Sequence, residues 1–174
     1  MDQAHKNMKK DIQKMFTRRL TGFQGEGRPD YWERLKMLKM YSLERRREQY
    51  LAIYAWKIIN NYVPNPGLKI TNNQRTGIHV SKFEIEHRLP GWLGKIKKNS
   101  TLLKCAVIFN SLPKYLRTEG IAENPLKFKR ELDKFLMNIP DQPTIPGRSR
   151  SANSNSLTDQ IVIYSINTSF PIGS

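Results

Sequence analysis

Cysteine is nearly absent from this sequence, because Cys105 is the single one among 174 residues. One thiol cannot form an internal disulfide, and disulfides are typical of chains that fold in oxidising compartments. Apolar runs of the ~18–20 residues that span a bilayer are missing too, as is the apolar stretch of a signal peptide. We therefore expect a soluble intracellular protein of the nucleus or the cytoplasm, with no membrane partner.

Residues that carry catalytic or metal chemistry are few and scattered. The six aspartates include no adjacent pair, whereas phosphoryl transfer by two metals needs clustered carboxylates. His5, His79 and His87 form no close pair of the kind that zinc sites use. The glycines within 22–27 lack the strand–helix context of a dinucleotide fingerprint. We expect no catalytic residue, metal, cofactor or small-molecule substrate, and we expect Cys105, on an apolar helix face, to be buried and unreactive.

Negative charge is also in short supply. The chain has 15 acidic against 30 basic residues, a formal net charge of +15. Such an excess is typical of nucleic-acid-binding domains, and an acidic protein partner is the alternative. The excess lies within residues 1–140, because 141–174 holds two basic and two acidic residues.

A first helix is expected over 11–20. Its apolar residues recur at helical spacing and share one face; they are Ile12, Met15, Phe16 and Leu20. Gly22 should close this helix, and residues 1–10 should form a flexible N-terminus.

Two longer helical segments follow. Asp30 precedes a glutamate by three residues, the spacing of a capping box, so the second helix should cover 31–41. Ser42 is the expected N-cap of a third helix over 43–61, which prolines end. The third helix is expected to bury one face, formed by Leu43, Arg47, Tyr50, Leu51, Tyr54 and Ile58.

The aromatic residues of the third helix allow two interpretations. Tyr50, Tyr54 and Trp56 can stack on unpaired bases if they are exposed, as in proteins that bind single strands. Their helical spacing among aliphatic residues favours the core instead. We therefore expect all three rings to be buried.

The middle of the chain, 68–98, is rich in glycine, proline and lysine and is expected to be irregular, with a strand at "GIHVS", 77–81. Ser100 or Thr101 is the expected N-cap of a fourth helix that ends at Asn110.

Two more helical segments are expected before residue 140. Pro113 suits the first turn of a brief helix that contains Leu116. Asn124 is the expected N-cap of a longer helix, with Pro125 at its first position. The amphipathic face of that helix consists of Phe128, Leu132, Phe135 and Leu136.

The C-terminal residues are rich in proline, serine and asparagine. Residues 141–160 are expected to be disordered, and "IVIYSI" at 161–166 has no evident partner. The predicted fold is therefore mainly α: a small, helical bundle-like basic domain over 11–140 with an irregular middle, followed by a disordered C-terminal tail over 141–174.

Basic residues on and between these helices are the candidate nucleic-acid contacts. Successive helical residues diverge by about 100°, so at most two of the three arginines at 45–47 can share one surface. A solvated face with local ion pairs is the alternative for all of these positions. The candidates are Arg34, Lys36, Lys39, Arg45, Arg46, Lys95, Lys97 and Lys98.

Four separated segments resemble, in this order, the region that follows the polymerase core in reverse transcriptases of animal non-LTR, LINE-type retrotransposons. They are "IQKMFTRRLTG" (12–22), "YWERLKMLKMYSLERRREQYLAIYAWKIINNYVPNPG" (31–67), "VIFNSLPKYLR" (107–117) and "FKRELDKFLMNIPDQP" (128–143). The resemblance spans about residues 10–160 and rests on four ordered motifs.

The resemblance implies a parent protein with an apurinic-type endonuclease and an RNA-directed DNA polymerase that primes on nicked target DNA. Neither the endonuclease nor the carboxylate-bearing palm occurs here, so no catalytic residue is carried over. We expect a catalytically dead C-terminal remnant that binds RNA or DNA without sequence specificity. The alternatives are a small helical interaction module that docks on a polymerase domain, and a nonfunctional open reading frame.

Overall fold

The computed structural model describes residues 3–22, 27, 29–73, 80–85, 100–118, 124–141 and 156–169. This part of the chain is mainly α-helical and contains one two-stranded sheet, so the predicted fold class is confirmed. The chain divides into two compact units. The first comprises Met1–Arg47 with Asp141–Asn155, and the second comprises Glu48–Pro140 with Ser156–Ser174. The segment 11–140 that we expected to be one domain contributes to both.

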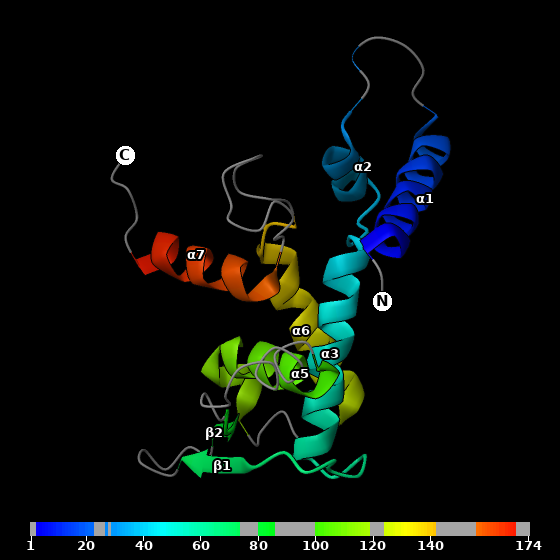
Figure 1. Ribbon diagram of the computed structural model, residues 1–174. Helices are drawn as coiled ribbons and strands as arrows, with labels where there is room; N and C mark the ends of the chain where they lie inside the picture. The colour runs from blue at the N-terminus through cyan, green and yellow to red at the C-terminus, as the bar shows by residue number, and fades with distance from the viewer. Residues whose placement is uncertain are drawn as a thin grey trace. The chain divides into compact units, whose positions relative to one another are not determined.

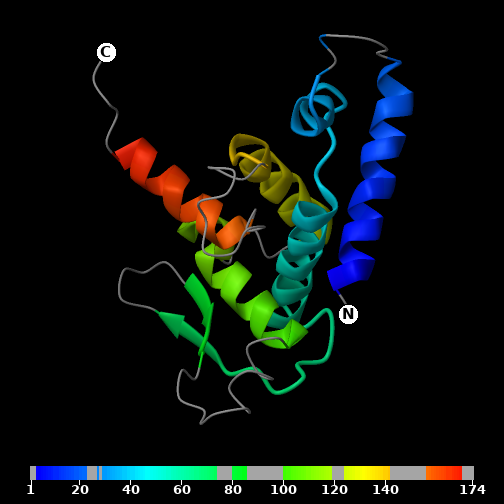
Figure 2. The ribbon, with the colours of Figure 1, turned by 45° about the horizontal axis from the view of Figure 1, so that its top comes forward.

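In the first unit, helix α1 (Gln3–Thr21) packs beside helix α2 (Tyr31–Met37), as Figures 1 and 2 both show. Helix α1 begins at Gln3, within the segment 1–10 that we expected to be a flexible N-terminus. The sequence "QAHKNMKK" contains no glycine or proline and is rich in good helix formers, which allows the helix to extend.

The start of α2 follows the predicted capping box. The Asp30 carboxylate accepts a hydrogen bond from the Glu33 backbone N–H at 2.7 Å, and the Glu33 carboxylate accepts one from the Asp30 N–H at 2.8 Å. Each side chain thus satisfies a backbone donor that the first helical turn leaves free.

The end of α2 comes at Met37, four residues before the predicted end. Lys39 adopts a left-handed conformation with φ 51°, and its N–H donates to the Lys36 carbonyl at 3.1 Å. The Met40 N–H donates to the Leu35 carbonyl at 2.8 Å. These bonds form a Schellman motif, which usually carries glycine at the left-handed position, so a lysine there gave no stop signal.

Gln13 lies at the polar centre of the first unit. Its side-chain oxygen accepts hydrogen bonds from the Tyr31 hydroxyl at 2.6 Å and from the Leu43 N–H at 3.1 Å. Its amide nitrogen donates to the Tyr41 carbonyl at 3.0 Å. One buried side chain therefore joins α1 to α2 and to the first residue of helix α3 (Leu43–Ile59).

Ionisation of Tyr31 makes the stability of the first unit decrease at alkaline pH. The pKa of Tyr31 is raised to about 12, chiefly by burial and also by the charge of Asp141, while the charge of Arg34 opposes the shift. The hydroxyl of an unfolded tyrosine titrates near pH ~10. Stability that is fully present below pH ~10 is therefore lost as the pH rises to about 12, by roughly 2–3 kcal/mol in all.

Tyr31→Phe should abolish this dependence. At pH ~8 the variant should be less stable by about 1 kcal/mol, because the hydrogen bond to Gln13 is gone. Between pH ~10 and ~12 its stability should fall less steeply than that of the parent. Urea unfolding across this range tests the expectation, with Tyr62→Phe, at a half-exposed ring, as the control. Parallel curves for all three proteins would contradict it.

Ser42 begins α3 as predicted. Its hydroxyl oxygen accepts the N–H of Arg45 at 3.1 Å, which is an N-cap hydrogen bond. The same hydroxyl donates to Asp141 at 2.8 Å, and the Ser42 N–H donates to the second carboxylate oxygen at 2.6 Å. Asp141 also forms an ion pair with Arg45, whose Nε lies 3.8 Å from Oδ1. Asp141, which we assigned to the disordered tail, is thus part of the first unit.

The second unit contains most of α3 and the remaining elements. These are β1 (Ile70–Asn73), β2 (Val80–Phe83), α5 (Thr101–Ser111), the 3₁₀ helix η1 (Lys114–Arg117), α6 (Pro125–Asn138) and α7 (Leu157–Ser169). The predicted N-caps are confirmed, since Ser100 accepts from the Leu103 N–H at 3.2 Å and Asn124 from the Leu126 N–H at 2.8 Å. The brief helix with a buried Leu116 is also confirmed.

The core of the second unit is centred on Trp56, which is 2% exposed. Its ring stacks on Phe128 of α6 at a centroid distance of 5.0 Å and on Tyr62 at 5.3 Å. The predicted apolar face of α6 is buried, including Leu132 and Leu136. The prediction that Trp56 belongs to the core is therefore confirmed.

A hairpin of β1 and β2 lies against α5. The strands pair antiparallel, with Ile70 opposite Phe83. The side-chain amide of Asn110 on α5 accepts from the Phe83 N–H at 2.9 Å and donates to the Phe83 carbonyl at 2.8 Å. The strand expected at 77–81 is present from Val80, whereas 77–79 lies outside the described residues.

Helix α7 lies within the segment 141–174 that we expected to be a disordered tail. Leu157 is fully buried and Ile161 nearly so, and α7 packs on the side of α5 (Figure 2). The Glu48 carboxylate of α3 accepts the Leu157 N–H, at 3.0 and 2.9 Å to its two oxygens. A carboxylate at a helix N-terminus satisfies a free donor and complements the helix dipole. The rest of the expected tail, 142–155 and 170–174, lies outside the described residues.

Candidate nucleic-acid interface

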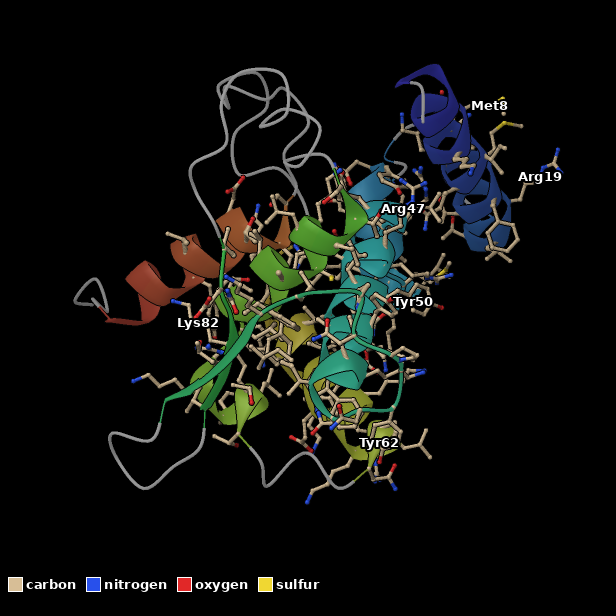
Figure 3. The ribbon with its side chains drawn as sticks, turned by 60° about the horizontal axis from the view of Figure 1, so that its bottom comes forward. Met8, Arg19, Arg47, Tyr50, Tyr62 and Lys82 are labelled. Atoms are coloured by element: carbon tan, nitrogen blue, oxygen red, sulfur yellow. The ribbon has the colours of Figure 1, made fainter. Side chains whose placement is uncertain are left out.

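One face of α3 combines exposed arginines with exposed tyrosine rings. Arg46 and Arg47 are exposed, and one turn further on Tyr50 is 62% exposed. Tyr54, 36% exposed, follows four residues later, and the half-buried Lys57 continues the same line. All five stand on one continuous helix (Figure 3 labels Arg47 and Tyr50), so helix geometry sets their spacing. We call these five residues the basic–aromatic face.

This arrangement corrects the predicted core face of α3. Of the six residues assigned to that face, Ile58 is buried as expected and Leu43 and Leu51 are partly buried, whereas Arg47, Tyr50 and Tyr54 are exposed. The opposite side of the helix is buried instead, and its residues are Arg45, Gln49, Ala52, Ala55 and Trp56.

Small and polar residues explain the difference. Ala52 and Ala55 allow neighbouring elements to approach closely, and Gln49 donates a hydrogen bond to Asp133 of α6. Because aliphatic residues surround most of α3, periodicity alone does not select one face. A tyrosine hydroxyl is readily hydrated, so tyrosine rings tolerate exposure better than Trp56 does.

The chemistry of the basic–aromatic face suits a nucleic-acid strand. A guanidinium donates paired hydrogen bonds to phosphate oxygens, and a tyrosine ring stacks on any base. Tyr50 and Tyr54 are separated by a rise of about 6 Å along the helix, with cations before and after them. The face therefore offers both of the contacts that single-strand binders use.

Arg34 is not available for phosphate contact, contrary to the prediction. Its side chain is buried, and Nη1 donates to the Pro29 carbonyl at 2.6 Å. Nε lies 3.4 Å from the hydroxyl of the buried Thr17 on α1. The guanidinium thus secures the entry to α2 inside the first unit.

Arg45 is likewise corrected, because it is fully buried and paired with Asp141. It occupies the first turn of α3, where its own N–H bonds to Ser42. A buried guanidinium cannot reach an external phosphate without unfolding its surroundings.

The remaining candidates differ in position. Lys36 is exposed in the last turn of α2, Lys39 is exposed just after that helix, and Arg46 is exposed on α3. Arg46 is exposed beside Arg47, which we had assigned to the apolar face of the third helix and had not counted among the candidates. The signal for Arg47 was its spacing of three and seven residues from Tyr50 and Tyr54. The candidates Lys95, Lys97 and Lys98 lie outside the described residues.

The single thiol is buried as predicted. Cys105 on α5 is inaccessible, and its Sγ donates to the Leu102 carbonyl at 3.0 Å. Burial raises the pKa of the Cys105 thiol, which lowers the fraction of reactive thiolate at neutral pH.

Other features of the described residues carry less chemistry. No three His, Cys, Asp or Glu side chains gather among them, and none of their helices is long and apolar enough to cross a membrane. An open hollow of about 650 Å³ lies beside β2 and includes Lys82, Val107 and Asn110 in its lining. The Asn110 amide is already engaged by the Phe83 backbone, so it holds the strand in place.

The chain matches no protein-family model, and neither a curated protein nor a solved structure shows significant similarity to it.

Proposed function

We propose that this chain is a catalytically inactive C-terminal remnant of a non-LTR retrotransposon reverse transcriptase that retains binding to RNA and DNA. The observation that carries the binding proposal is the basic–aromatic face of α3, with both tyrosine rings open to solvent. The four ordered motifs within 12–143 support the origin.

Binding through this face is independent of sequence and favours unpaired strands. Phosphate contacts by arginine and lysine carry no sequence information, and the net charge of +15 attracts any polyanion. Stacking requires an exposed base face, which a duplex does not offer away from its ends. Single-stranded RNA and DNA should therefore bind more tightly than duplexes of equal length.

Two double variants separate charge from stacking. Arg46→Gln/Arg47→Gln should weaken binding to single strands and duplexes, and should reduce the slope of log affinity against log salt by about 0.7–0.9 for each phosphate that the variant no longer neutralises. Tyr50→Ser/Tyr54→Ser should weaken single-strand binding by about 1–3 kcal/mol for each stacked ring and leave the salt slope unchanged. Fluorescence anisotropy with labelled oligonucleotides at several salt concentrations measures both effects.

The matched control is Lys129→Gln/Arg130→Gln on α6, which removes the same charge from an exposed surface of another helix. Circular dichroism should show unchanged helicity for all three variants. If the α3 and α6 variants lose affinity equally, the binding is diffuse and the basic–aromatic face is only a solvated surface. In that case the interaction-module alternative replaces the proposal.

The proposed origin is tested separately in the genome. A remnant predicts an upstream frame with the catalytic aspartate pair of a reverse transcriptase, or with decayed codons for it. An upstream region that encodes an unrelated, intact protein fused to this chain would refute that origin and would leave the binding proposal standing.

A further inference from the structure

Helix α1 exposes its apolar face to solvent. Five apolar side chains line its outer side, and each is 51–58% exposed. We call them the apolar stripe; they are Met8, Ile12, Met15, Phe16 and Leu20. Single exposed apolar residues are common, but a continuous patch of this kind marks an interaction site.

The inner face of α1 is polar. Gln13 and Thr17 are buried, and they hold α1 against the rest of the first unit through Tyr31 and Arg34. Hydrogen bonds to these partners fix the rotation of the helix about its axis. The side of α1 that carries Gln13 and Thr17 faces the rest of the first unit, so the apolar stripe on the other side points outward.

Positive charge accompanies the apolar stripe. Helix α1 contains six basic residues and one acidic residue, Asp11, which pairs with Lys14 at 3.1 Å. Lys9, Arg18 and Arg19 are exposed. Arg19 extends from the same side of α1 as Met8 (Figure 3). The stripe therefore has cations along its length and at both ends.

We propose that α1 is an interfacial helix that lies on an anionic phospholipid surface, in contrast to our expectation from the sequence that the chain has no membrane partner. At 100° per residue the apolar stripe covers an arc of about 140°, from Met15 to Leu20. This convex arc fits a flat, deformable surface into which apolar side chains enter to the depth of the headgroups. Lys9 and Arg19 reach the lipid phosphates from within the same arc, because long basic side chains extend toward the polar layer.

Other partners fit the apolar stripe less well. A second copy of the chain would bring its basic residues against those of the first and would repel it. A nucleic-acid strand gains stacking from aromatic rings, and Phe16 is the single ring of the stripe. An acidic amphipathic helix of another protein would complement the positive charge of α1. Such helices usually bind in a groove, however, and the exposed side of α1 is convex.

The buried Cys105 allows a direct test, because a new surface cysteine can be labelled selectively. Met15→Cys places an environment-sensitive fluorophore on the apolar stripe. Met137→Cys places the same fluorophore on α6 as a control, because the Met137 side chain is 70% exposed. Vesicles of phosphatidylcholine alone are compared with vesicles containing roughly one-third phosphatidylserine. The emission of the label at Met15→Cys should shift to the blue with the vesicles that contain phosphatidylserine and should stay unchanged with pure phosphatidylcholine. The emission of the label at Met137→Cys should stay unchanged with both.

Substitutions that leave the net charge unchanged distinguish insertion of the apolar stripe into lipid from electrostatic attraction of the basic chain to anionic headgroups. Ile12→Ser/Phe16→Ser should lower the vesicle-binding constant at least about tenfold in sedimentation, since two half-exposed apolar side chains no longer enter the lipid. Leu126→Ser/Met137→Ser on α6 should bind like the parent. If both pairs bind like the parent and ~0.5 M salt releases all of them, the basic chain is merely attracted to charge and the proposal fails. Absence of binding to either vesicle also refutes it and leaves an acidic protein helix as the partner.

Discussion

Trp56→Ala should lower the free energy of unfolding by about 3–5 kcal/mol. The indole is 2% exposed and stacks on the rings of Phe128 and Tyr62, at centroid distances of 5.0 and 5.3 Å. Removing it opens a cavity at the junction of α3 and α6 and forfeits both stacking contacts. The decrease is a large part of the ~5–15 kcal/mol that stabilises a typical domain.

Urea unfolding followed by far-ultraviolet circular dichroism measures this decrease. Tyr54→Ala on the same helix is the matched control, because its ring is partly exposed and should cost less than about 1 kcal/mol. A Trp56→Ala variant that folds with parental stability but no longer binds single strands would make Trp56 the stacking residue. That result would contradict both the core assignment and the basic–aromatic face as described.

Features decided within one helical turn could be predicted from the sequence. The capping box of Asp30 and Glu33 and the N-caps Ser42, Ser100 and Asn124 all act within three residues of themselves. Hydrogen bonds over so few residues depend on the local residue types alone, so these helix starts could be predicted from the sequence, and the structure confirms them. The apolar face of α6 was also predictable, because Phe128, Leu132, Phe135 and Leu136 recur at the spacing of one helical face.

The orientation of a helix depends on distant partners. The buried side of α3 is set by contacts such as Gln49 with Asp133, which are 84 residues apart. In α1, Gln13 and Thr17 form the buried side because Tyr31 and Arg34 bond to them. A prediction from hydrophobic periodicity takes the apolar side of a helix to be the buried side, whereas in α1 the apolar side is exposed and the polar side is buried.

The C-terminal elements were missed for the same reason. Glu48 holds the first N–H of α7 across 109 residues of sequence. The candidate site was affected as well, since the burial of Arg45 follows from a carboxylate 96 positions later, at Asp141. No local pattern distinguishes an arginine that will meet a buried acid from one that will meet solvent.

Asp141→Ala should destabilise the first unit by about 3 kcal/mol. Asp141 accepts two hydrogen bonds from Ser42 and forms the ion pair with Arg45, whose side chain is fully buried. Removing one partner of a buried pair commonly costs about 3–5 kcal/mol, because a charge stays behind in a medium that solvates it poorly. The low end applies here, since the carboxylate is 18% exposed and water reaches its site.

A double substitution distinguishes the ion pair from the hydrogen bonds. Arg45→Met/Asp141→Leu removes both charges and fills their volume, so it should be less destabilising than the sum of the two single variants. Asp141→Asn keeps an oxygen for Ser42 but not the charge, and its stability should fall between that of the parent and that of Asp141→Ala. Urea unfolding and hydrogen exchange at α1 and α2 report the effect. Strict additivity of the two single effects would mean that Arg45 and Asp141 do not stabilise each other, and that Asp141 acts through Ser42 alone.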